Sequence, residues 1–240
     1  MKIISNNNLN FGWDLRTHLH ITEHALDDND TLSRKEKRMI ARCSQMPDLI
    51  EKEIEDVNAA HFYDPLHEDP SYGTKNDDVN NAMSKFLYHT EEAMNKLKLD
   101  ADTDKKREEF MREVGYAVHY LQDASTPPHT EAGNYAQKLF RLPMHINFEC
   151  GLGVGASWKL DKLKANHTPE ELPFSTLKML FHNTALFTVQ EENKVKYKNL
   201  GRWPEIQQRC YDRGVNASKA YLDYILQYLP QEPKQIDYMA

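Results

Sequence analysis

Cysteine is scarce in this 240-residue chain, and its three copies, Cys43, Cys150 and Cys210, lie far apart. A small, odd and scattered set does not indicate a disulfide framework. Long apolar runs are also missing, and the mean hydropathy is -0.77, so we expect no transmembrane segment. The first ten residues carry no apolar stretch of signal-peptide length. We therefore expect either a cytoplasmic protein or one secreted by a signal-independent route or after removal of a leader.

Basic residues are not in excess, because 37 acids face 30 bases for a formal net charge of -7. We expect no duplex nucleic acid as a partner, since electrostatic attraction supplies much of the affinity for a phosphate backbone. An enzyme that holds phosphate through metal ions stays compatible with this charge. Hydrophobic residues make up 40% of the chain and aromatic residues 10%, which predicts a folded core rather than disorder.

Strand-like alternation is rare in the sequence, whereas helical spacing of apolar residues recurs along it. No repeat or linker divides the chain, so we predict one all-α domain, a single-domain multi-helix bundle over residues 1–240. Within it, residues 1–12 are expected to be flexible or processed. The predicted helices cover residues 17–27, 33–43, 47 onward, 80–99 and 104–125, and others follow Pro143, Pro173 and Pro204.

Local signals predict where several of these helices begin and end. Ser33 followed by Glu36 forms a capping box at a helix N-terminus. Asp104 is placed to cap the next long helix, and the double proline at Pro127 should terminate it. The prolines and glycine within residues 61–78 indicate a loop.

Histidine is the one residue type that is unusually frequent, with 11 copies. Zinc sites use imidazole and carboxylate ligands, and a spacing of four residues places two such groups on one helix face. Chance alone gives about two pairs of a histidine and an acid at this spacing. The sequence contains four, namely His24/Asp28, His119/Asp123, His145/Glu149 and His167/Glu171.

The neighbouring residues indicate which of these pairs are candidates for metal binding. His119 lies in the otherwise apolar helical segment 115–123 and should be buried, and His129 follows directly after the double proline. The pairs that begin at His24 and His167 lie among polar residues near helix ends, where we expect solvated side chains. A core histidine paired with a neighbouring aspartate remains an alternative for His119.

The remaining candidates are ambiguous when each is considered alone. His61 opens the segment His-Phe-Tyr-Asp-Pro, and Asp48 follows Pro47 in the first turn of a predicted helix. A carboxylate there also complements the helix dipole without binding metal. The N-terminal helix holds His18, His20 and His24, and the last two have the spacing of a metal pair.

Taken together in order, these motifs resemble the zinc-dependent phospholipase C family, the bacterial phosphatidylcholine-hydrolysing enzymes and their toxin relatives, which are related to single-strand-specific zinc nucleases. The resemblance covers about the first two thirds of the chain. It rests on Thr17-His18, Pro47-Asp48, Ala60 to Pro65, His119 to Asp123, Pro128-His129 and His145 to Glu149.

The resemblance implies an all-α fold with a polynuclear zinc cleft that holds two or three Zn2+ ions. His61, His119 and Asp48 would ligate one ion, and Asp123 would bridge it to a second ion that His18 ligates. His129, His145 and Glu149 would ligate the third. The resemblance therefore favours His18 over its two neighbouring histidines. It also implies a bacterial source and a phospholipid substrate.

Three positions depart from the family pattern. Secreted members complete the second zinc site with an N-terminal tryptophan, and the nearest tryptophan here is Trp13, five residues before His18. That short spacing is similar to the nucleases, whereas Glu149 and the His-Phe-Tyr-Asp-Pro segment favour the phospholipases. Leu49 and Asn58 stand where choline-selective relatives carry aromatic residues, so an aromatic cage for choline is not expected.

We therefore expect a zinc-dependent phospholipase C that hydrolyses the glycerol-side phosphodiester of phospholipids by metal-activated water. Asp48 is the candidate general base, as well as or instead of a ligand. Two alternatives are a zinc-dependent nuclease or other phosphodiesterase of the same fold, and a non-catalytic metal-binding helical module. Peripheral membrane contact is also expected to be possible. The residues that could form an apolar rim for it, or else belong to the ordinary core, are Leu139, Phe140, Leu142 and Met144.

Overall fold

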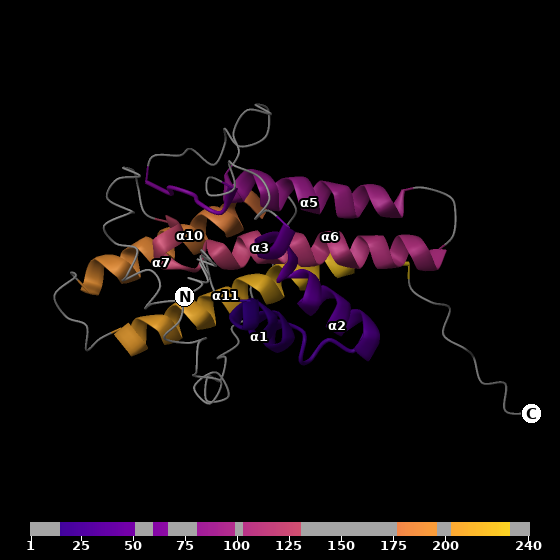
Figure 1. Cartoon of the computed structure of the whole chain (residues 1–240), viewed down its shortest axis with the longest axis horizontal. Coiled ribbons are helices and arrows are strands. Elements are labelled where there is room, and N and C mark those ends of the chain that lie inside the picture. The colour runs from indigo at the N-terminus through magenta and orange to yellow at the C-terminus, as the bar shows by residue number, and fades with distance from the viewer. Residues whose placement is uncertain are drawn as a thin grey trace, which may run out of the picture.

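A computed structural model describes residues 15–50, 60–66, 81–98, 103–130, 177–195 and 203–230. Within these ranges every regular element is a helix (Figure 1), as the all-α prediction requires. The helices are α1 (Leu15–Ala25), α2 (Arg34–Cys43), α3 (Met46–Ile50), α5 (Ala82–Leu97), α6 (Thr103–Asp123), α7 (Pro127–Thr130), α10 (Leu177–Val195) and α11 (Trp203–Leu226). In this part of the chain, no helix combines the length and the apolarity needed to cross a lipid bilayer.

Helix α6 is the central element, and several other helices pack against it. It contacts α5, α2, α11 and α1, and Figure 1 shows α5 running alongside it. Its apolar residues recur every three or four positions, so they face several neighbours at once. The fully buried ones are Phe110, Met111, Val114, Ala117, Val118 and Leu121.

The predicted capping box at the start of α2 is confirmed. The backbone N–H of Glu36 donates to the Ser33 hydroxyl over 3.3 Å, and the Glu36 carboxylate accepts from the Ser33 backbone N–H over 2.7 Å. An analogous box that the sequence analysis did not identify begins α5, where Asn81 and Ser84 exchange the same two bonds. Both boxes satisfy backbone N–H groups that a helix start leaves without partners.

The end of α6 differs from the prediction in one respect. The helix stops at Asp123, ahead of the double proline as expected, but Pro127 then begins the short helix α7. Proline suits a first helical turn because its missing N–H is not needed there. At the other end, α6 begins at Thr103, so Asp104 lies in the first turn instead of capping the helix. The consequence for the site is that α7 turns His129 back beside the C-terminal end of α6.

Gly115 allows α2 and α6 to approach closely. A Cβ atom at this position would lie 2.5 Å from the Cys43 Cβ and 2.7 Å from the Ile40 carbonyl oxygen. Such distances are far below van der Waals contact, so only glycine fits without a shift of one helix. This approach brings the C-terminal end of α2, including Ser44, against the middle of α6.

Candidate metal centre

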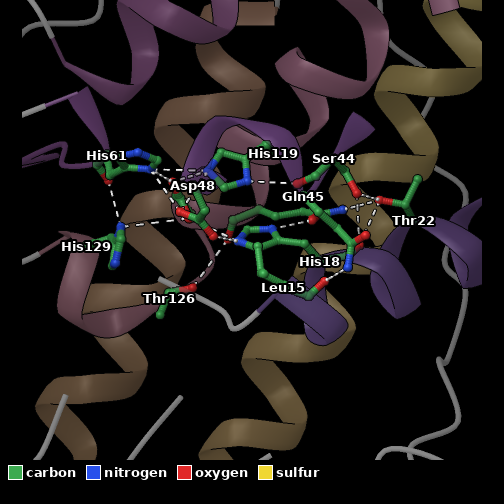
Figure 2. Close-up of polar contacts among 12 residues, drawn as sticks. Leu15, His18, Thr22, Ser44, Gln45, Asp48, His61, His119, Thr126 and His129 are labelled. Carbon is green, nitrogen blue, oxygen red and sulfur yellow. Dashed lines mark hydrogen bonds and ion pairs between the residues drawn. The ribbon is translucent and has the colours of Figure 1, made fainter. Parts of the chain in front are cut away.

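Side chains from five parts of the fold converge beside the C-terminal half of α6 (Figure 2). His119 and Asp123 lie one turn apart on α6, His18 comes from α1 and Asp48 from α3. His61 belongs to the short segment 60–66, and His129 belongs to α7. All six side chains are buried, although each is polar or charged: His18, Asp48, His61, His119, Asp123 and His129.

Two overlapping groups of these residues have the spacing of metal sites. Asp48, His61 and His119 form one group, and His18, His119 and Asp123 form the other. In each group the potential ligand atoms lie within 4.8 Å of one another. Because His119 belongs to both, the two groups form one continuous cluster.

Three of the separations between ligand atoms are close to those around a small tetrahedral ion. Bonds of the usual zinc length place neighbouring ligand atoms about 3.3–3.4 Å apart. The His119 Nε2 lies 3.3 Å from the Asp123 Oδ2 and 3.2 Å from the His61 Nδ1. The His18 Nε2 lies 3.5 Å from the Asp123 Oδ1. His61 Nδ1 and Asp123 Oδ2 are closer, at 2.7 Å.

Each carboxylate has one oxygen beside each side of the cluster. Asp123 directs Oδ2 toward His61 and His119, and Oδ1 toward His18. Asp48 directs Oδ1 toward His119 at 3.7 Å and His61 at 4.0 Å, and its Oδ2 lies 3.9 Å from the His18 Nε2. The resemblance implied a bridging role for Asp123 alone, whereas the geometry allows either carboxylate to bridge.

Three of the histidines are oriented through their other ring nitrogen. His18 Nδ1 lies 2.7 Å from the Gln122 Oε1, and His119 Nδ1 lies 2.8 Å from the Ser44 carbonyl oxygen. His129 Nδ1 lies 2.8 Å from the His61 carbonyl oxygen. Since each acceptor is an oxygen, each imidazole donates its Nδ1–H and keeps the Nε2 lone pair. Metal-binding histidines in proteins are commonly held in this way.

Gln122 is a residue of the site whose role the sequence analysis missed. While its Oε1 accepts from His18, its Nε2 donates to the Thr22 hydroxyl over 2.8 Å and to the Ser218 hydroxyl over 3.3 Å. These bonds leave the amide only one orientation that satisfies all three neighbours. The signal was present in the sequence, because Gln122 is an uncharged polar residue inside a segment predicted to be buried.

A bound cation would give a partner to polar atoms that are buried in the cluster. Among the residues that the structure describes, His18 Nε2 and Asp123 Oδ1 form no hydrogen bond, although both atoms are buried. Burying such atoms without a partner is destabilising, and burying two carboxylates together is more so. The nitrogen and oxygen atoms are ligands that Zn2+ prefers. The described residues therefore fit a zinc centre.

The electrostatics of the cluster agree with this chemistry. Burial lowers the pKa of His18 well below its usual value and the pKa of His129 to about 4, so both rings are neutral, as ligation requires. Burial acts in the same direction on His119, but the charges of Asp123 and Asp48 outweigh it and raise its pKa. Burial alone would raise the pKa of Asp123, yet His119, His129 and His61 lower it well below its usual value.

The structure does not bring the other N-terminal histidines to the cluster. His20 Nδ1 lies 3.8 Å from a Glu23 carboxylate oxygen, away from the site. His24 is half-buried and its Nδ1 lies 3.0 Å from the Tyr211 hydroxyl. His24 is therefore less exposed than expected, because Tyr211 of α11 lies beside it.

Several predicted features lie outside the described residues. These are Trp13, Asn58, His145, Glu149, the pair His167/Glu171 and the apolar rim formed by Leu139, Phe140, Leu142 and Met144. Within the described part, Leu49 follows Asp48 and is 45% exposed.

Comparison with known proteins places the fold. No family model and no curated protein matches the chain. A crystal structure of Clostridium perfringens alpha-toxin from an avian strain is similar with a TM-score of 0.68 and 17% identity, covering 91% of this chain and 65% of the toxin chain. Alpha-toxin from Clostridium absonum is similar with a TM-score of 0.62 and 18% identity, covering 90% of this chain and 64% of that chain. This chain thus spans slightly less than two thirds of either toxin, and the likeness shows a shared helical fold.

Proposed function

We propose that this protein is a zinc-dependent phosphodiester hydrolase of the phospholipase C type. The observation that carries the proposal is the buried cluster in which two carboxylates each face histidines on both sides. Such an arrangement suits adjacent cations, and adjacent zinc ions are suited to phosphodiester cleavage. The site belongs to one all-α domain, which we propose extends over the whole chain.

The ligand sets that we propose follow the resemblance found in the sequence. His61, His119 and Asp48 would hold one ion, His18 would hold a second, and Asp123 would contribute to both. Trp13 is a further candidate ligand for the second ion. His129, with His145 and Glu149, would hold a third ion. In support, the Nδ1–H of His129 is committed to the His61 carbonyl, which keeps its Nε2 as the ligand atom.

When bound, zinc lowers the pKa of a coordinated water and neutralises the phosphoryl oxygens. The chain itself contributes orientation through Ser44 and Gln122 and a proton acceptor in Asp48, whose two oxygens reach both sides of the cluster. Asp48 takes the proton of the attacking water, the water oxygen adds to phosphorus, and the glycerol-side oxygen leaves and gains a proton. The products are diacylglycerol and a phosphorylated head group.

Phospholipid is the substrate class that we favour. The His-Phe-Tyr-Asp-Pro segment supports it, because the motif resembles that of the phospholipases. In the structure, Phe62 of this segment stacks on His129 at a ring distance of 4.8 Å, and the Tyr63 hydroxyl lies 2.8 Å from the His182 Nδ1. The segment therefore also supports the site physically.

A substrate comparison tests the proposal. The same zinc-loaded sample is assayed against a panel of dispersed phospholipids and against single-stranded DNA, with release of diacylglycerol and of nucleotides as the two readouts. We expect diacylglycerol from one or more phospholipids, and no product from an Asp123→Asn variant. Asp27→Asn, an exposed carboxylate beyond the end of α1, is the matched control and should stay active. Cleavage of DNA without diacylglycerol release would replace the phospholipase assignment with the nuclease.

A further inference from the structure

A cationic groove lies between α2 and α6. The groove has a volume of about 590 Å³, and among the residues that the structure describes it is lined by five basic ones and no acidic one. Arg34, Arg38 and Arg42 recur every four positions along α2, and Arg112 faces them from α6. The rise of an α-helix spaces the three α2 arginines about 6 Å apart. A local excess of positive charge is unexpected on a chain with a net charge of -7.

The acids nearest these arginines along the two helices are engaged elsewhere. Glu36 is paired with Arg107, Glu108 with Lys35 at 2.8 Å, and Glu113 with His89 at 2.7 Å. Lys35, the fifth basic residue of the groove, is thereby partly neutralised. The side chains of the four arginines form no hydrogen bond or ion pair with any residue in the part of the chain that the structure describes. Their guanidinium groups are exposed and available to an external anion.

The floor of the groove is apolar instead of charged. Met39, Met46 and Tyr116 line it, and all three are half-buried. Guanidinium groups pair with phosphate through two parallel hydrogen bonds, and a weakly polar floor beneath them strengthens that attraction. A solvated helix face would need neither a hollow nor a floor of this kind.

Exposed apolar side chains follow the groove in the sequence, on the helix that carries Asp48. Met46, at its end, is the first residue of α3, which carries Asp48. Leu49 and Ile50, on the next turn of α3, are 45% and 50% exposed. Basic residues beside exposed aliphatic side chains are the combination that binds a peripheral protein to an anionic lipid surface.

We propose that the Arg34, Arg38, Arg42 and Arg112 groove binds the phosphate groups of anionic lipids and so holds the protein on a membrane surface. The choice of lipid over another phosphate compound rests on the proposed function, whereas the phosphate chemistry does not. A nucleic-acid strand fits less well, because Tyr116 is the only aromatic residue that lines the groove within the described ranges, and strand binding relies on several stacking rings. Arg42 and Met46 flank Ser44, so a lipid held there lies on the α2–α3 side of the cluster.

Vesicle sedimentation tests this proposal. Binding is measured to vesicles of phosphatidylcholine alone and of phosphatidylcholine with phosphatidylglycerol, and is repeated in an Asp123→Asn background so that hydrolysis does not alter the lipid. We expect tighter binding to the anionic vesicles, weakened by added salt. A triple variant, R34Q/R38Q/R42Q, should lose about fivefold per arginine, or roughly 100-fold in total.

The matched control removes three positive charges outside the groove, as K85Q/K96Q/K98Q on α5 and its C-cap, and should bind anionic vesicles nearly as well as the parent. Equal losses of vesicle affinity in both triple variants would contradict binding at the groove, since affinity would then depend only on net charge. Tight binding of inorganic phosphate with no preference for anionic vesicles would assign the groove to a soluble phosphate, and tighter binding of a single-stranded oligonucleotide would assign it to nucleic acid. Either result contradicts the lipid assignment.

The test of the groove and the test of the proposed function can fail independently. If Asp123→Asn binds anionic vesicles while the wild type releases no diacylglycerol, the groove stands and the phospholipase assignment fails. If diacylglycerol is released but the arginine variant binds as the parent does, the groove fails and the enzyme stands.

Discussion

The geometry is compatible with two functions for Asp48, as a metal ligand and as a general base. Its Oδ1 faces His119 and His61, and its Oδ2 faces His18, so it is placed both to ligate and to accept a proton. A carboxylate held tightly by a cation is a poorer base. The two functions therefore make different predictions for a substitution that keeps the shape of the side chain.

We predict that Asp48→Asn lowers kcat on phospholipid by about 10²–10⁴-fold. If Asp48 acts chiefly as base, the variant keeps its zinc, and if it acts chiefly as ligand, zinc content falls in parallel with kcat. Metal analysis and turnover on one preparation separate the two cases. Full turnover in this variant would rule out the base assignment.

Gln122 orients His18, and we predict that removing its amide weakens zinc binding. Gln122→Leu keeps the volume but leaves the Nδ1–H of His18 without its acceptor, so zinc affinity should fall about 10–100-fold. Gln122→Glu is the matched control, because it retains an oxygen for His18 and should hold zinc better than the leucine variant. Competition with a coloured chelator measures both. Equal affinity in the two variants would show that Gln122 only fills space.

At the scale of elements, the position of Ser44 depends on how closely α2 packs against α6. Gly115→Ala would place a Cβ atom 2.5 Å from the Cys43 Cβ. Alanine favours helix formation by about 0.5–1 kcal/mol, but overpacking costs about 1–3 kcal/mol, so we expect net destabilisation. The melting temperature should fall by a few degrees. Because Ser44 carries the acceptor for His119, zinc affinity should fall as well. An increase in melting temperature would contradict the close approach.

The sequence predicted the elements better than it predicted their contacts. Caps and breakers are local, so Ser33 with Glu36 and the end of α6 before the double proline could be read directly. Pro127 starting a new helix was missed, because a proline that ends one helix is equally compatible with the first turn of the next. The pairing of His119 with Ser44 is a tertiary contact between α6 and the end of α2, and no local pattern specifies it.

The same limit applies to the site. Residue spacing placed His119 and Asp123 on one helix face, and the resemblance selected His18 over its neighbours. The convergence of four further elements on that face, and the role of Gln122, depend on packing across more than 100 residues of sequence. His24 is less exposed than expected for the same reason, since Tyr211 of α11, 187 positions further along the chain, contacts it.

For the whole molecule, we predict that the metal-free protein becomes less stable as the pH falls below 6.5. Burial lowers the pKa of His129 to about 4 and also lowers that of His18. The unfolded chain therefore binds more protons than the folded chain between about pH 6.5 and 4, and stability decreases across that window. His129 alone contributes up to about 3 kcal/mol of this loss. Urea unfolding with a chelator at pH 7.5 and 5 measures it, and an unchanged midpoint would contradict neutral buried rings.

The charges of the chain are distributed unevenly over the whole molecule. The formal charge of -7 describes neither the site nor the groove, because Asp48 and Asp123 lie within a buried cluster proposed to hold cations, and the four arginines of α2 and α6 form a cationic surface. We therefore propose two positions for phosphate on an acidic chain. One is proposed to react with it and the other to hold it.

The most direct test of the central claim is the zinc content of the purified protein, measured by elemental analysis together with its melting temperature before and after zinc is added. We predict two or three zinc ions per chain, a clear rise in melting temperature when zinc is restored to stripped protein, and loss of at least one ion in Asp123→Asn. A protein that holds no zinc and gains no stability from it would contradict the account and leave the buried histidines as structural residues.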